Sequence, residues 1–572
     1  MTPIKLCLLW HQHQPYYRAG NRFLMPWAWL HSTKDYLEMV QHLERRPDMH
    51  ATINLVPSLL KQIEEYLAGD AYDRVVDLMT KNAETLSSED KVFMLDNFFI
   101  ALRESLIDRS QRYRELYEKA YLPGPDRQSR FEIQDYRDLA VHYSLEWTGE
   151  ISRMQEPFRS LVEKDRGYTE DDKQALMRAQ IENVRKIIPL HRDLSNSGQI
   201  ELTTTPFYHP ILPLLVDSMS AREAMPNVPL PSSPFKAPEE ADGQLRMSRE
   251  FFKNKLGIEP NGLWPSEGSI SQDVLALIRK NGFLWTASDE GVLKNSIGSQ
   301  SVQFGSTNIN PEHAKYFPWK AETPDGELIV FFRDHSLSDD IGFTYQTWNA
   351  RDAAEHFKAN ILKIRNELIE SYGEEITAQA CISVILDGEN CWEYYPRNGF
   401  EFLDTLYSTL TSTLEISPVT FSNAITASHK ENLPLLPHVV AGSWIAANFN
   451  IWIGHPENNA AWDAIAKAKV DFDIAKNRAE SMSDGNSAAM AQMESAHEEL
   501  MIAEGSDWWW WYGDEHFSAQ KNVYDELFRG HLRAMYEKLD LTVPANLNRP
   551  ISIPTTSDEA THKYGAMQPA AG

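Results

Sequence analysis

The sequence predicts an α/β fold in which parallel strands alternate with helices. Short apolar, β-rich segments recur along the chain and are followed by helical patterning, which is typical of parallel α/β architecture. Two of these segments stop on a carboxylate: Gly262 to Ser266 is followed by Glu267, and Ile382 to Leu386 by Asp387. Because parallel strands deliver their last residues to the rim where ligands sit, these two acids are the leading candidates for a reacting pair.

The strand predictions run in order along the first 430 residues. The first apolar run, beginning at Ile4, is too short for the core of a secretory leader and leads straight into polar residues, so it is interpreted as a strand. After Glu267, serine hydroxyls precede an amphipathic run to Lys280, and Asn281-Gly282 stops it, which predicts a strand–helix unit. The predicted strands are 4–10, 200–204, 262–264, 283–287, 328–332 and 382–386.

Length and helical periodicity predict further parts. A chain of 572 residues exceeds one ordinary core, so more than one domain is expected. We predict a barrel-type domain over 1–430 with a helical insertion at about 58–195, because that stretch has helical periodicity and few strand signals. From 431 to 543 helices dominate, which predicts a C-terminal helical domain that completes the cleft. A flexible tail rich in Pro, Thr and Ala is expected over 544–572.

Composition excludes several classes of partner. With 55 basic against 82 acidic side chains the net charge is −27, which argues against nucleic acid and against an anionic membrane surface. No apolar run is long enough to span a membrane. The three cysteines, Cys7, Cys381 and Cys391, have no C-x-x-C spacing, so neither a disulfide framework nor a thiolate zinc site is expected, and a cytoplasmic location is predicted. The 16 tryptophans include candidates for stacking on sugar rings, although most aromatic side chains are expected in the core.

Polar side chains cluster where the other predicted strands end. Two facing acids are what glycosidic cleavage requires, one to protonate the leaving oxygen and one to attack or to activate water. We expect Asp387 to need a raised pKa and Glu267 to stay ionised, helped by hydrogen bonds from the histidines or Arg333. The remaining candidates for ligand binding at strand ends are His11, His13, Glu201, Arg333 and Glu389.

Each candidate also has a structural interpretation. Glu267 and Asp387 could be solvated turn acids, with about even odds on the residues alone. His11 and His13 alternate along an extended segment, so they could bind a ligand together; as a metal pair they lack a third ligand at diagnostic spacing. Glu201 could bind substrate hydroxyls or cap the histidines, and an ion pair with an aspartate is at least as probable for Arg333 as a ligand contact.

Tryptophans near these motifs are ambiguous in the same way. Trp264, beside Glu267, could stack on a sugar or belong to the core. Trp508 to Trp511 cannot share one helix face, so some must pack inward while others, with Trp510 our candidate, reach a cleft. If helical, Trp444 and Asn448 would fall on one stripe with Trp452 and His455.

Five short runs together resemble the conserved regions of glycoside hydrolase family 57, in the expected order. Individually they are weak signals, but the ordered set is specific. They are HQHQP (11–15), GQIEL (198–202), LWPSE (263–267), LDGEN (386–390) and WIAANFN (444–450) continuing to His455.

The resemblance implies an incomplete (β/α)7 barrel with a C-terminal helical domain and retaining chemistry on α-glucans. It makes Glu267 the nucleophile and Asp387 the acid/base, and it places Trp444 and Asn448 against the barrel mouth. The run after Asp387 looks more like amylopullulanases and related α-amylases than like branching enzymes. No cofactor or catalytic metal is implied, and the substrate is an α-glucan or malto-oligosaccharide with α-1,4 linkages, α-1,6 linkages remaining open.

Three alternatives stay open at this point. A 4-α-glucanotransferase or branching enzyme would share the covalent intermediate and differ in its acceptor. A zinc-dependent α-mannosidase or a deacetylase would need several His and Asp ligands, and the HQHQP run lacks the His-x-Asp arrangement expected of that mannosidase type. A non-catalytic glucan-binding protein would use the same aromatic cleft without the acids. Oligomeric state is not predicted.

Overall fold

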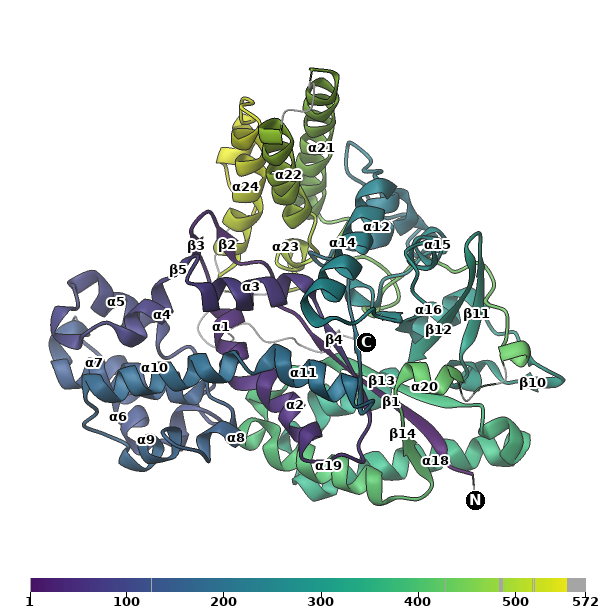
Figure 1. The fold of residues 1–572 in the computed structure, drawn as a ribbon, viewed down its shortest axis with the longest axis horizontal. Helices are drawn as coiled ribbons and strands as arrows, with labels where there is room; N and C mark the ends of the chain where they lie inside the picture. The colour runs from purple at the N-terminus through teal and green to yellow at the C-terminus, as the bar shows by residue number, and fades with distance from the viewer. Residues whose placement is uncertain are drawn as a thin grey trace.

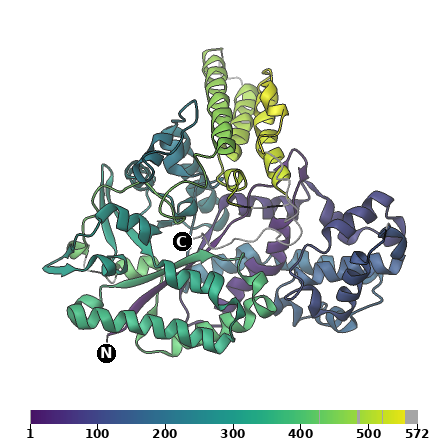
Figure 2. The same ribbon diagram turned by 180° about the vertical axis from the view of Figure 1, so that it is seen from behind.

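The computed structural model describes residues 2–124, 126–426, 428, 430–482, 487–516, 518 and 520–552. A central set of strands is flanked on one side by the helices that follow β4 and on top by the long helices near the C-terminus (Figure 1). The view from behind shows the same three parts (Figure 2). Within the described residues, no helix combines the length and the apolar character needed to cross a bilayer.

Seven parallel strands form the central barrel in the order β6-β4-β1-β13-β12-β8-β7. The middle strand β1 is buried along its whole length and pairs with β13 from Lys5 opposite Cys381 to His11 opposite Asp387. The seven strands are β1 (Ile4–Gln12), β4 (Ala51–Leu55), β6 (Ile200–Thr203), β7 (Gly262–Leu263), β8 (Trp285–Asp289), β12 (Gly326–Arg333) and β13 (Cys381–Asp387). The predicted α/β class is confirmed, and the barrel of seven strands is nearly closed, as the family resemblance implies.

Two junctions of the barrel are thin. The outer strands β6 and β7 meet through one bridge, Thr204 to Leu263, and β12 reaches β13 through one pair, Arg333 to Ser383. The other neighbours share longer registers. Thr204, Leu263 and Arg333 lie at or next to the carboxyl ends of their strands, whereas Ser383 lies near the start of β13.

Strand β4 was not predicted. Thr52 and Asn54 interrupt its apolar character, and both are fully buried. Short additional strands extend or flank the barrel: β11 (Trp319–Thr323) pairs antiparallel with β12, and β14 (Ile416–Pro418) pairs with β1. The remaining short strands are β2 (Arg18–Ala19), β3 (Arg22–Phe23), β5 (Tyr72–Asp73), β9 (Val302–Phe304) and β10 (Thr307–Ile309).

Helices follow the barrel strands, as expected for parallel strands that need crossovers. The predicted cap of the helix after Glu267 is confirmed, because the Ser271 side chain accepts a hydrogen bond from the Val274 amide and the helix ends at Lys280. The helices between or beside the barrel strands are α1 (Trp27–His31), α2 (Leu37–Glu44), α12 (Leu212–Val216), α13 (Ala221–Ala224), α14 (Pro238–Leu256), α15 (Gln272–Lys280), α16 (Glu290–Ile297), α17 (His335–Asp339), α18 (Ala350–Thr377), α19 (Phe400–Ser412) and α20 (Phe421–Thr426).

The stretch between β4 and β6 is helical apart from the two-residue strand β5. Its helices are α3 (Pro57–Ala68), α4 (Arg74–Thr80), α5 (Ser88–Asn97), α6 (Gln111–Tyr121), α7 (Ile133–Glu146), α8 (Glu150–Arg153), α9 (Phe158–Lys164), α10 (Glu170–Val184) and α11 (Ile187–Asn196). Helices α4 to α7 and α9 lie away from the barrel on one side, whereas α3 and α11 lie beside its strands (Figure 1). We call this stretch the helical insertion; its domain boundaries stay a prediction.

The C-terminal part is built from α21 (Pro456–Met482), α22 (Ser487–Ala503), α23 (Asp507–Trp510) and α24 (Lys521–Lys538). Beyond them, the Leu547 carbonyl accepts hydrogen bonds from Arg529 and Arg533, so the described start of the predicted tail is held against α24. The rest of that predicted tail, 553–572, lies outside the described residues.

Candidate active site

Glu267 sits on a strained turn directly after β7. Its φ of 57° lies in the left-handed region that non-glycine residues rarely adopt. Trp444 holds it twice: the indole Nε1 donates to Glu267 Oε2 at 2.7 Å, and the Trp444 amide donates to the Glu267 carbonyl at 2.9 Å. Strain at a buried turn persists when its surroundings fix it, and here Trp444 does so while aiming the carboxylate.

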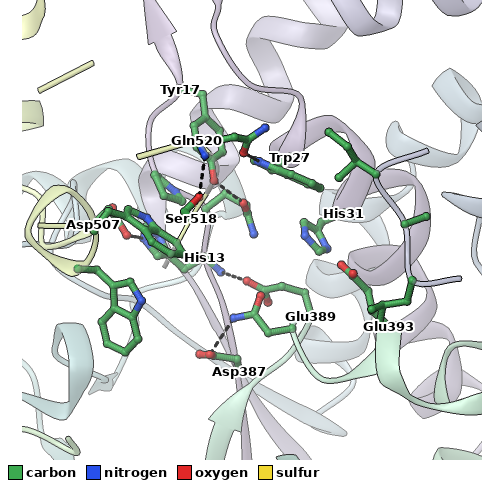
Figure 3. A pocket seen from close by; sticks show the side chains of 18 of the residues that line it. His13, Tyr17, Trp27, His31, Asp387, Glu389, Glu393, Asp507, Ser518 and Gln520 are labelled. Carbon is green, nitrogen blue, oxygen red and sulfur yellow. Dashed lines mark hydrogen bonds and ion pairs between the residues drawn. The ribbon is translucent and has the colours of Figure 1, made fainter. Parts of the chain in front are cut away.

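Asp387 is the last residue of β13, opposite His11 on β1. The Asn390 amide donates to Asp387 Oδ2 at 3.0 Å (Figure 3). Asp387 and Glu267 both line one cavity of about 690 Å³, and each is partly exposed to it. The structure therefore brings the two predicted acids into one space.

Both acids hold protons more tightly than ordinary carboxyl groups. Burial, with the nearby charge of Asp387, raises the pKa of Glu267 to about 8, although the Trp444 hydrogen bond opposes this. Burial raises the pKa of Asp387 to about 6, against the Asn390 hydrogen bond and the charges of His13 and Arg333. The expected hydrogen bonds from the histidines or Arg333 to Glu267 are replaced by the one from Trp444. The expectation that Glu267 stays ionised is wrong for the free protein, because burial and the charge of Asp387 raise its pKa above that of Asp387. Because interacting acids titrate as a unit, the pair carries one proton near neutral pH.

A histidine cluster flanks the acids. His11 Nδ1 lies 2.6 Å from Asn54 Oδ1, and its Nε2 lies 3.2 Å from His209 Nε2. The His13 ring stacks on His209 with centroids 3.8 Å apart, and its Nε2 lies 2.9 Å from Asp507 Oδ1. Burial lowers the pKa of His11 to about 3 and that of His209 well below its usual value, so both are neutral hydrogen-bonding groups at physiological pH.

Among the described residues, His13, His209 and Asp507 form a group whose ligand atoms lie within 4.8 Å of one another. This third ligand, absent from the sequence pattern, comes from distant segments. A metal ion binds a histidine nitrogen in the ring plane, whereas the His13 and His209 rings lie face to face with 18° between their planes. His13 Nε2 is also engaged by Asp507, and the two His209 nitrogens by His11 and Ser506, whereas His13 Nδ1 is buried without a hydrogen-bond partner. The arrangement fits a hydrogen-bond network better than a tetrahedral ion.

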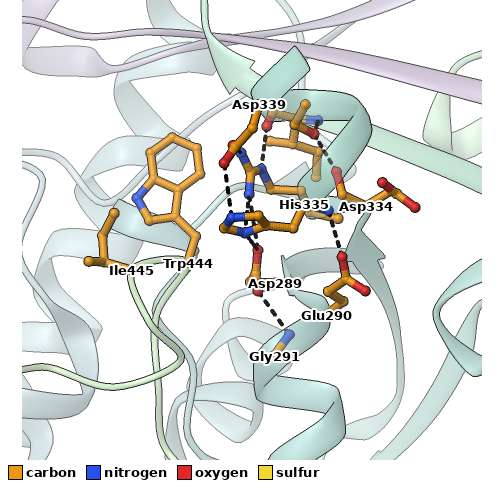
Figure 4. A network of polar contacts seen from close by, with 12 residues as sticks. Asp289, Glu290, Gly291, Asp334, His335, Asp339, Trp444 and Ile445 are labelled. Atoms are coloured by element: carbon orange, nitrogen blue, oxygen red, sulfur yellow. Dashed lines mark hydrogen bonds and ion pairs between the residues drawn. The ribbon is translucent and has the colours of Figure 1, made fainter. Parts of the chain in front are cut away.

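Arg333 does not line the cavity and belongs instead to a charged network whose members Asp289, His335 and Asp339 lie beside Trp444 (Figure 4). Its guanidinium donates to Asp289 at 3.1 Å and to Asp339 at 2.6 Å, and its carbon Cζ lies 5.4 Å from the Trp444 ring centre. Burial alone would raise the pKa of Asp339, but His335 and Arg333 lower it, and hydrogen bonds to Asp289 and Asp339 raise the pKa of His335 to about 10. Every charge in this network therefore has an opposite partner.

Glu201, Trp264 and Asn448 were also predicted to bind substrate, and they do not line the cavity either. Glu201 accepts hydrogen bonds from the Trp285 indole at 2.9 Å and from Ser422. Trp264 is fully buried between His11 and Trp444. Neither one contacts the cavity, so these placements give Glu201 and Trp264 a packing role inside the barrel.

The predicted helical stripe through Trp444 and Asn448 does not form. The chain from 441 to 455 runs as turns, with positive φ at Ala446 and Ala447, and Asn448 Oδ1 accepts a hydrogen bond from the Asn450 amide. Trp444 lines the cavity and Asn448 does not. The turns allow the Trp444 amide and indole to reach Glu267 together, which a helix would prevent.

The four consecutive tryptophans divide as predicted. Trp508 and Trp509 are each 1% exposed, whereas Trp510 and Trp511 line the cavity. Trp510 stacks on His516 with ring centroids 4.0 Å apart. Of the nine predicted binding residues, the structure thus gathers at the cavity His11, His13, Glu389, Trp444 and Trp510.

Several lining residues were missed. His209, which follows the predicted strand at 200–204, was not selected either; it is 1% exposed, stacks on His13 and does not itself line the cavity. Asp507 precedes the tryptophan run. The first helices contribute Trp27, whose indole donates to Gln520 at 3.2 Å, and His31, whose Nδ1 lies 2.7 Å from Asp35 (Figure 3 shows Trp27 and His31 facing the cavity). No local motif marks these residues, because they meet through the tertiary fold.

Comparisons with known proteins agree with this architecture. The model of glycosyl hydrolase family 57 matches residues 7–437. A branching enzyme of that family from Thermococcus kodakaraensis is similar in structure, with TM-score 0.60, 15% identity and coverage of 94% of this chain and 90% of that one. A family 57 branching enzyme from Pyrococcus horikoshii is similar with TM-score 0.57 and 15% identity, over 99% of this chain and 99% of that one. The α-amylase AmyC from Thermotoga maritima is similar with TM-score 0.56 and 13% identity, over 94% of this chain and 93% of that one. No curated protein matches the chain.

Proposed function

The chain belongs to glycosyl hydrolase family 57, and on that premise we propose that it is a retaining glycosidase for α-glucans in which Glu267 is the nucleophile and Asp387 the acid/base. The observation that carries the proposal is the acid pair itself. Two carboxyl groups at the ends of different barrel strands line one cavity and interact electrostatically. Such a pair, holding one proton between its members, is what glycosidic cleavage requires, and the retaining course is proposed from the family resemblance.

The first step uses the shared proton. In the free protein the higher pKa of Glu267, about 8 against about 6, places that proton mainly on Glu267, and cleavage starts from the form in which Asp387 holds it instead. Asp387 then protonates the glycosidic oxygen as the bond to the anomeric carbon breaks, and ionised Glu267 bonds to that carbon from the other face. The aglycone leaves as an alcohol. Glu267 thereby loses its negative charge, which removes the electrostatic repulsion that raises its pKa.

The second step reverses the roles. Asp387, now ionised, accepts a proton from water as the water oxygen bonds to the anomeric carbon, and Glu267 leaves as a carboxylate. Trp444 supports both steps, because its indole N–H donates to Glu267 Oε2 and stabilises the charge that returns there. Two displacements at one carbon leave its configuration unchanged.

The cavity walls support a neutral, ring-shaped substrate. Tryptophan and tyrosine faces suit the apolar faces of sugars, and Trp27, Trp147, Trp444, Trp510 and Trp511 all line the space. Structurally similar proteins are described as branching enzymes and an α-amylase, which supports α-glucans as the substrate class. We propose α-1,4 cleavage, with α-1,6 cleavage to be decided by the product profile, and favour an amylopullulanase-like enzyme.

Glycosyl transfer is the second candidate. The aromatic lining comes from two separate parts, the C-terminal helices and the helical insertion, so the cavity offers ring faces for an acceptor sugar as well as a donor. Incubation with maltoheptaose separates the two reactions. Hydrolysis yields shorter oligosaccharides, whereas transfer yields longer ones beside them.

A cytoplasmic location is part of the proposal. All three cysteines are free thiols buried in the fold, which is compatible with a reducing compartment. Fractionation of the native host, followed by activity assay, tests it.

Azide rescue tests the two catalytic roles. In an Asp387→Ala variant acting on an aryl α-glucoside, azide should enter from the side that Asp387 vacates and give an α-glucosyl azide. In Glu267→Ala, azide should replace the nucleophile and give the β-glucosyl azide. Product configuration is read by proton NMR.

The control is Asp325→Asn, which changes an exposed acid in the turn between β11 and β12. It should retain the activity of the unaltered protein and show no azide product. Opposite azide configurations would exchange the two roles, and undiminished hydrolysis by either alanine variant would refute the assignment.

A further inference from the structure

The geometry points to a second sugar-binding surface on the helical insertion, built from other elements than the barrel segments that carry the acids, and we propose that it selects long glucan chains. We call it the insertion platform, and it consists of Phe99, Arg103, Tyr117 and Tyr121. The inference rests on the proposed function, since it names the length of the substrate for the same cavity.

The platform is a compact aromatic cluster. Tyr117 and Tyr121 are one turn apart on α6, with ring centroids 4.5 Å apart. Phe99, from the segment after α5, packs edge-on against both, at 5.7 Å and 6.1 Å between centroids. Phe99 is 5% exposed and forms the base of the cluster, whereas Tyr121 is 53% exposed. A core role explains Phe99 but leaves the outward face of Tyr121 unexplained.

The same cavity reaches from the acids to the platform. All four platform residues line the space that Glu267 and Asp387 line. The lining also includes Trp147, the residue after α7, whose ring packs against Trp27 and His31. A ligand that enters the cavity can therefore contact both the acids and the platform without crossing a second surface.

The chemistry of the platform fits a neutral polyhydroxylated chain. Arg103 Cζ lies 5.3 Å from the Tyr117 ring centre, which leaves guanidinium N–H groups beside an aromatic face. A sugar ring can place its apolar face on the tyrosines and a hydroxyl oxygen on Arg103. The described lining contains five acids and, apart from Arg103, no lysine or arginine, so an anionic chain such as a nucleic acid is disfavoured.

The consequence is selectivity for chain length. An oligosaccharide that fills the floor near Glu267 and Asp387 leaves the platform empty, whereas a longer chain gains the stacking contacts. The extra contacts should raise kcat/KM for long substrates and leave that for short ones unchanged.

The test compares maltotriose with maltoheptaose in Tyr117→Ala and Tyr121→Ala variants. Loss of one stacking contact should lower kcat/KM for maltoheptaose about five- to tenfold, since each tenfold corresponds to about 1.4 kcal/mol. The maltotriose value should not change. Tyr117→Phe and Tyr121→Phe keep the ring face and should restore the maltoheptaose value. Tyr72→Ala is the matched control, because Tyr72 is a 41% exposed tyrosine of the insertion that does not line the cavity.

Direct binding separates this inference from the proposed function. In a Glu267→Gln background, calorimetry should show weaker maltoheptaose binding when Tyr121→Ala is added. If the unaltered protein cleaves no glucan but this difference in binding holds, the catalytic proposal falls and the platform stands. If the alanine variants lose equal activity on both lengths, or none on either, the platform is refuted while the acids keep their role. If maltoheptaose does not bind the Glu267→Gln protein, both fail.

Discussion

Two groups of acids lie near Trp444 in opposite electrostatic surroundings. The cavity floor consists of Glu267 and Asp387, and the network consists of Asp289, Arg333, His335 and Asp339. Glu267 and Asp387 are left without a cationic partner in hydrogen-bond contact among the described residues, and burial raises both pKa values. Asp289 and Asp339, one strand-end away, are paired with Arg333 and His335. Reactive acids must exchange protons near neutral pH, whereas supporting acids must hold a charge, and the surroundings decide which occurs.

The largest effect should come from Glu267→Gln at the floor. Removing the nucleophile should lower activity on maltoheptaose by about 10³-fold or more, because the amide cannot form the glycosyl ester. Release of reducing ends measures it, with Asp325→Asn as the matched acid-to-amide control. Near-native turnover by Glu267→Gln would show that the floor acids are as dispensable as a surface acid.

Breaking the network around Arg333 should lower the free energy of unfolding more than it lowers the catalytic rate. Arg333→Met leaves buried Asp289 and half-buried Asp339 with His335 as their remaining partner and should destabilise the protein by at most about 3–5 kcal/mol. Arg333→Lys keeps the charge but not the fork of donors, so an intermediate loss is expected. Urea unfolding monitored by tryptophan fluorescence gives the order. Equal stability of Arg333→Met and the unaltered protein would mean that these ion pairs contribute nothing.

A substitution at Glu267 should raise the free energy of unfolding, whereas one at Arg333 lowers it. Glu267 has a pKa of about 8 in the fold, above its unfolded value, so its stabilising contribution is complete at low pH and is lost as pH rises toward 8. Glu267→Gln mimics the protonated acid and should stabilise the protein by about 1–3 kcal/mol at pH 8, a gain that vanishes near pH 4. Unfolding at both pH values measures this. A variant less stable at pH 8 than the unaltered protein would contradict it.

The pH profile of kcat/KM should show the shared proton. Activity requires one proton on the pair, so the profile should be a bell with limbs near about 6 and about 8, set by Asp387 and Glu267 as a coupled unit. Initial rates on maltoheptaose from pH 4 to 10 give both limbs. A single acidic limb near 4, with no alkaline limb, would indicate acids with ordinary pKa values.

The smallest effect is expected for Trp444→Phe. The indole hydrogen bond lowers the pKa of Glu267, so its loss should move the alkaline limb upward, by less than about one pH unit because one hydrogen bond contributes about 1 kcal/mol. Phenylalanine keeps the ring beside Arg333. Trp264→Phe, a buried neighbour with no contact to Glu267 Oε2, is the comparison and should leave the limb in place. A downward shift in Trp444→Phe would exclude this role.

Much of the barrel could be predicted because its strands are buried on both faces and therefore read as apolar runs. Strand β4 escaped because Thr52 and Asn54 interrupt the run. Asn54 is polar for a reason that lies elsewhere in the chain: it contacts His11 Nδ1 and donates to the Thr203 hydroxyl. A local pattern cannot distinguish such a residue from a loop residue.

The predictions of site residues divide in the same way, between local signals that succeed and tertiary contacts that no local signal records. His11, His13, Glu389, Trp444 and Trp510 were predicted and do line the cavity. Glu201, Trp264, Arg333 and Asn448 were predicted and do not, because a strand-end position fixes proximity to the rim but not the direction of the side chain. Asp507 and the insertion platform reach the cavity, and His209 reaches the histidines that line it, across large separations in the chain that no spacing rule records.

By itself the sequence determined the α/β class, the family, and the two acids at strand ends, because the spacing of apolar residues and the ends of strands are local properties of the chain. The tertiary structure alone decided how those acids ionise. Their pKa values depend on what packs around them, and the indole of Trp444, the amide of Asn390 and the apolar walls come from segments far apart in the chain. Electrostatic energy in a protein follows distance in space and exclusion of water, and neither is written in the order of residues.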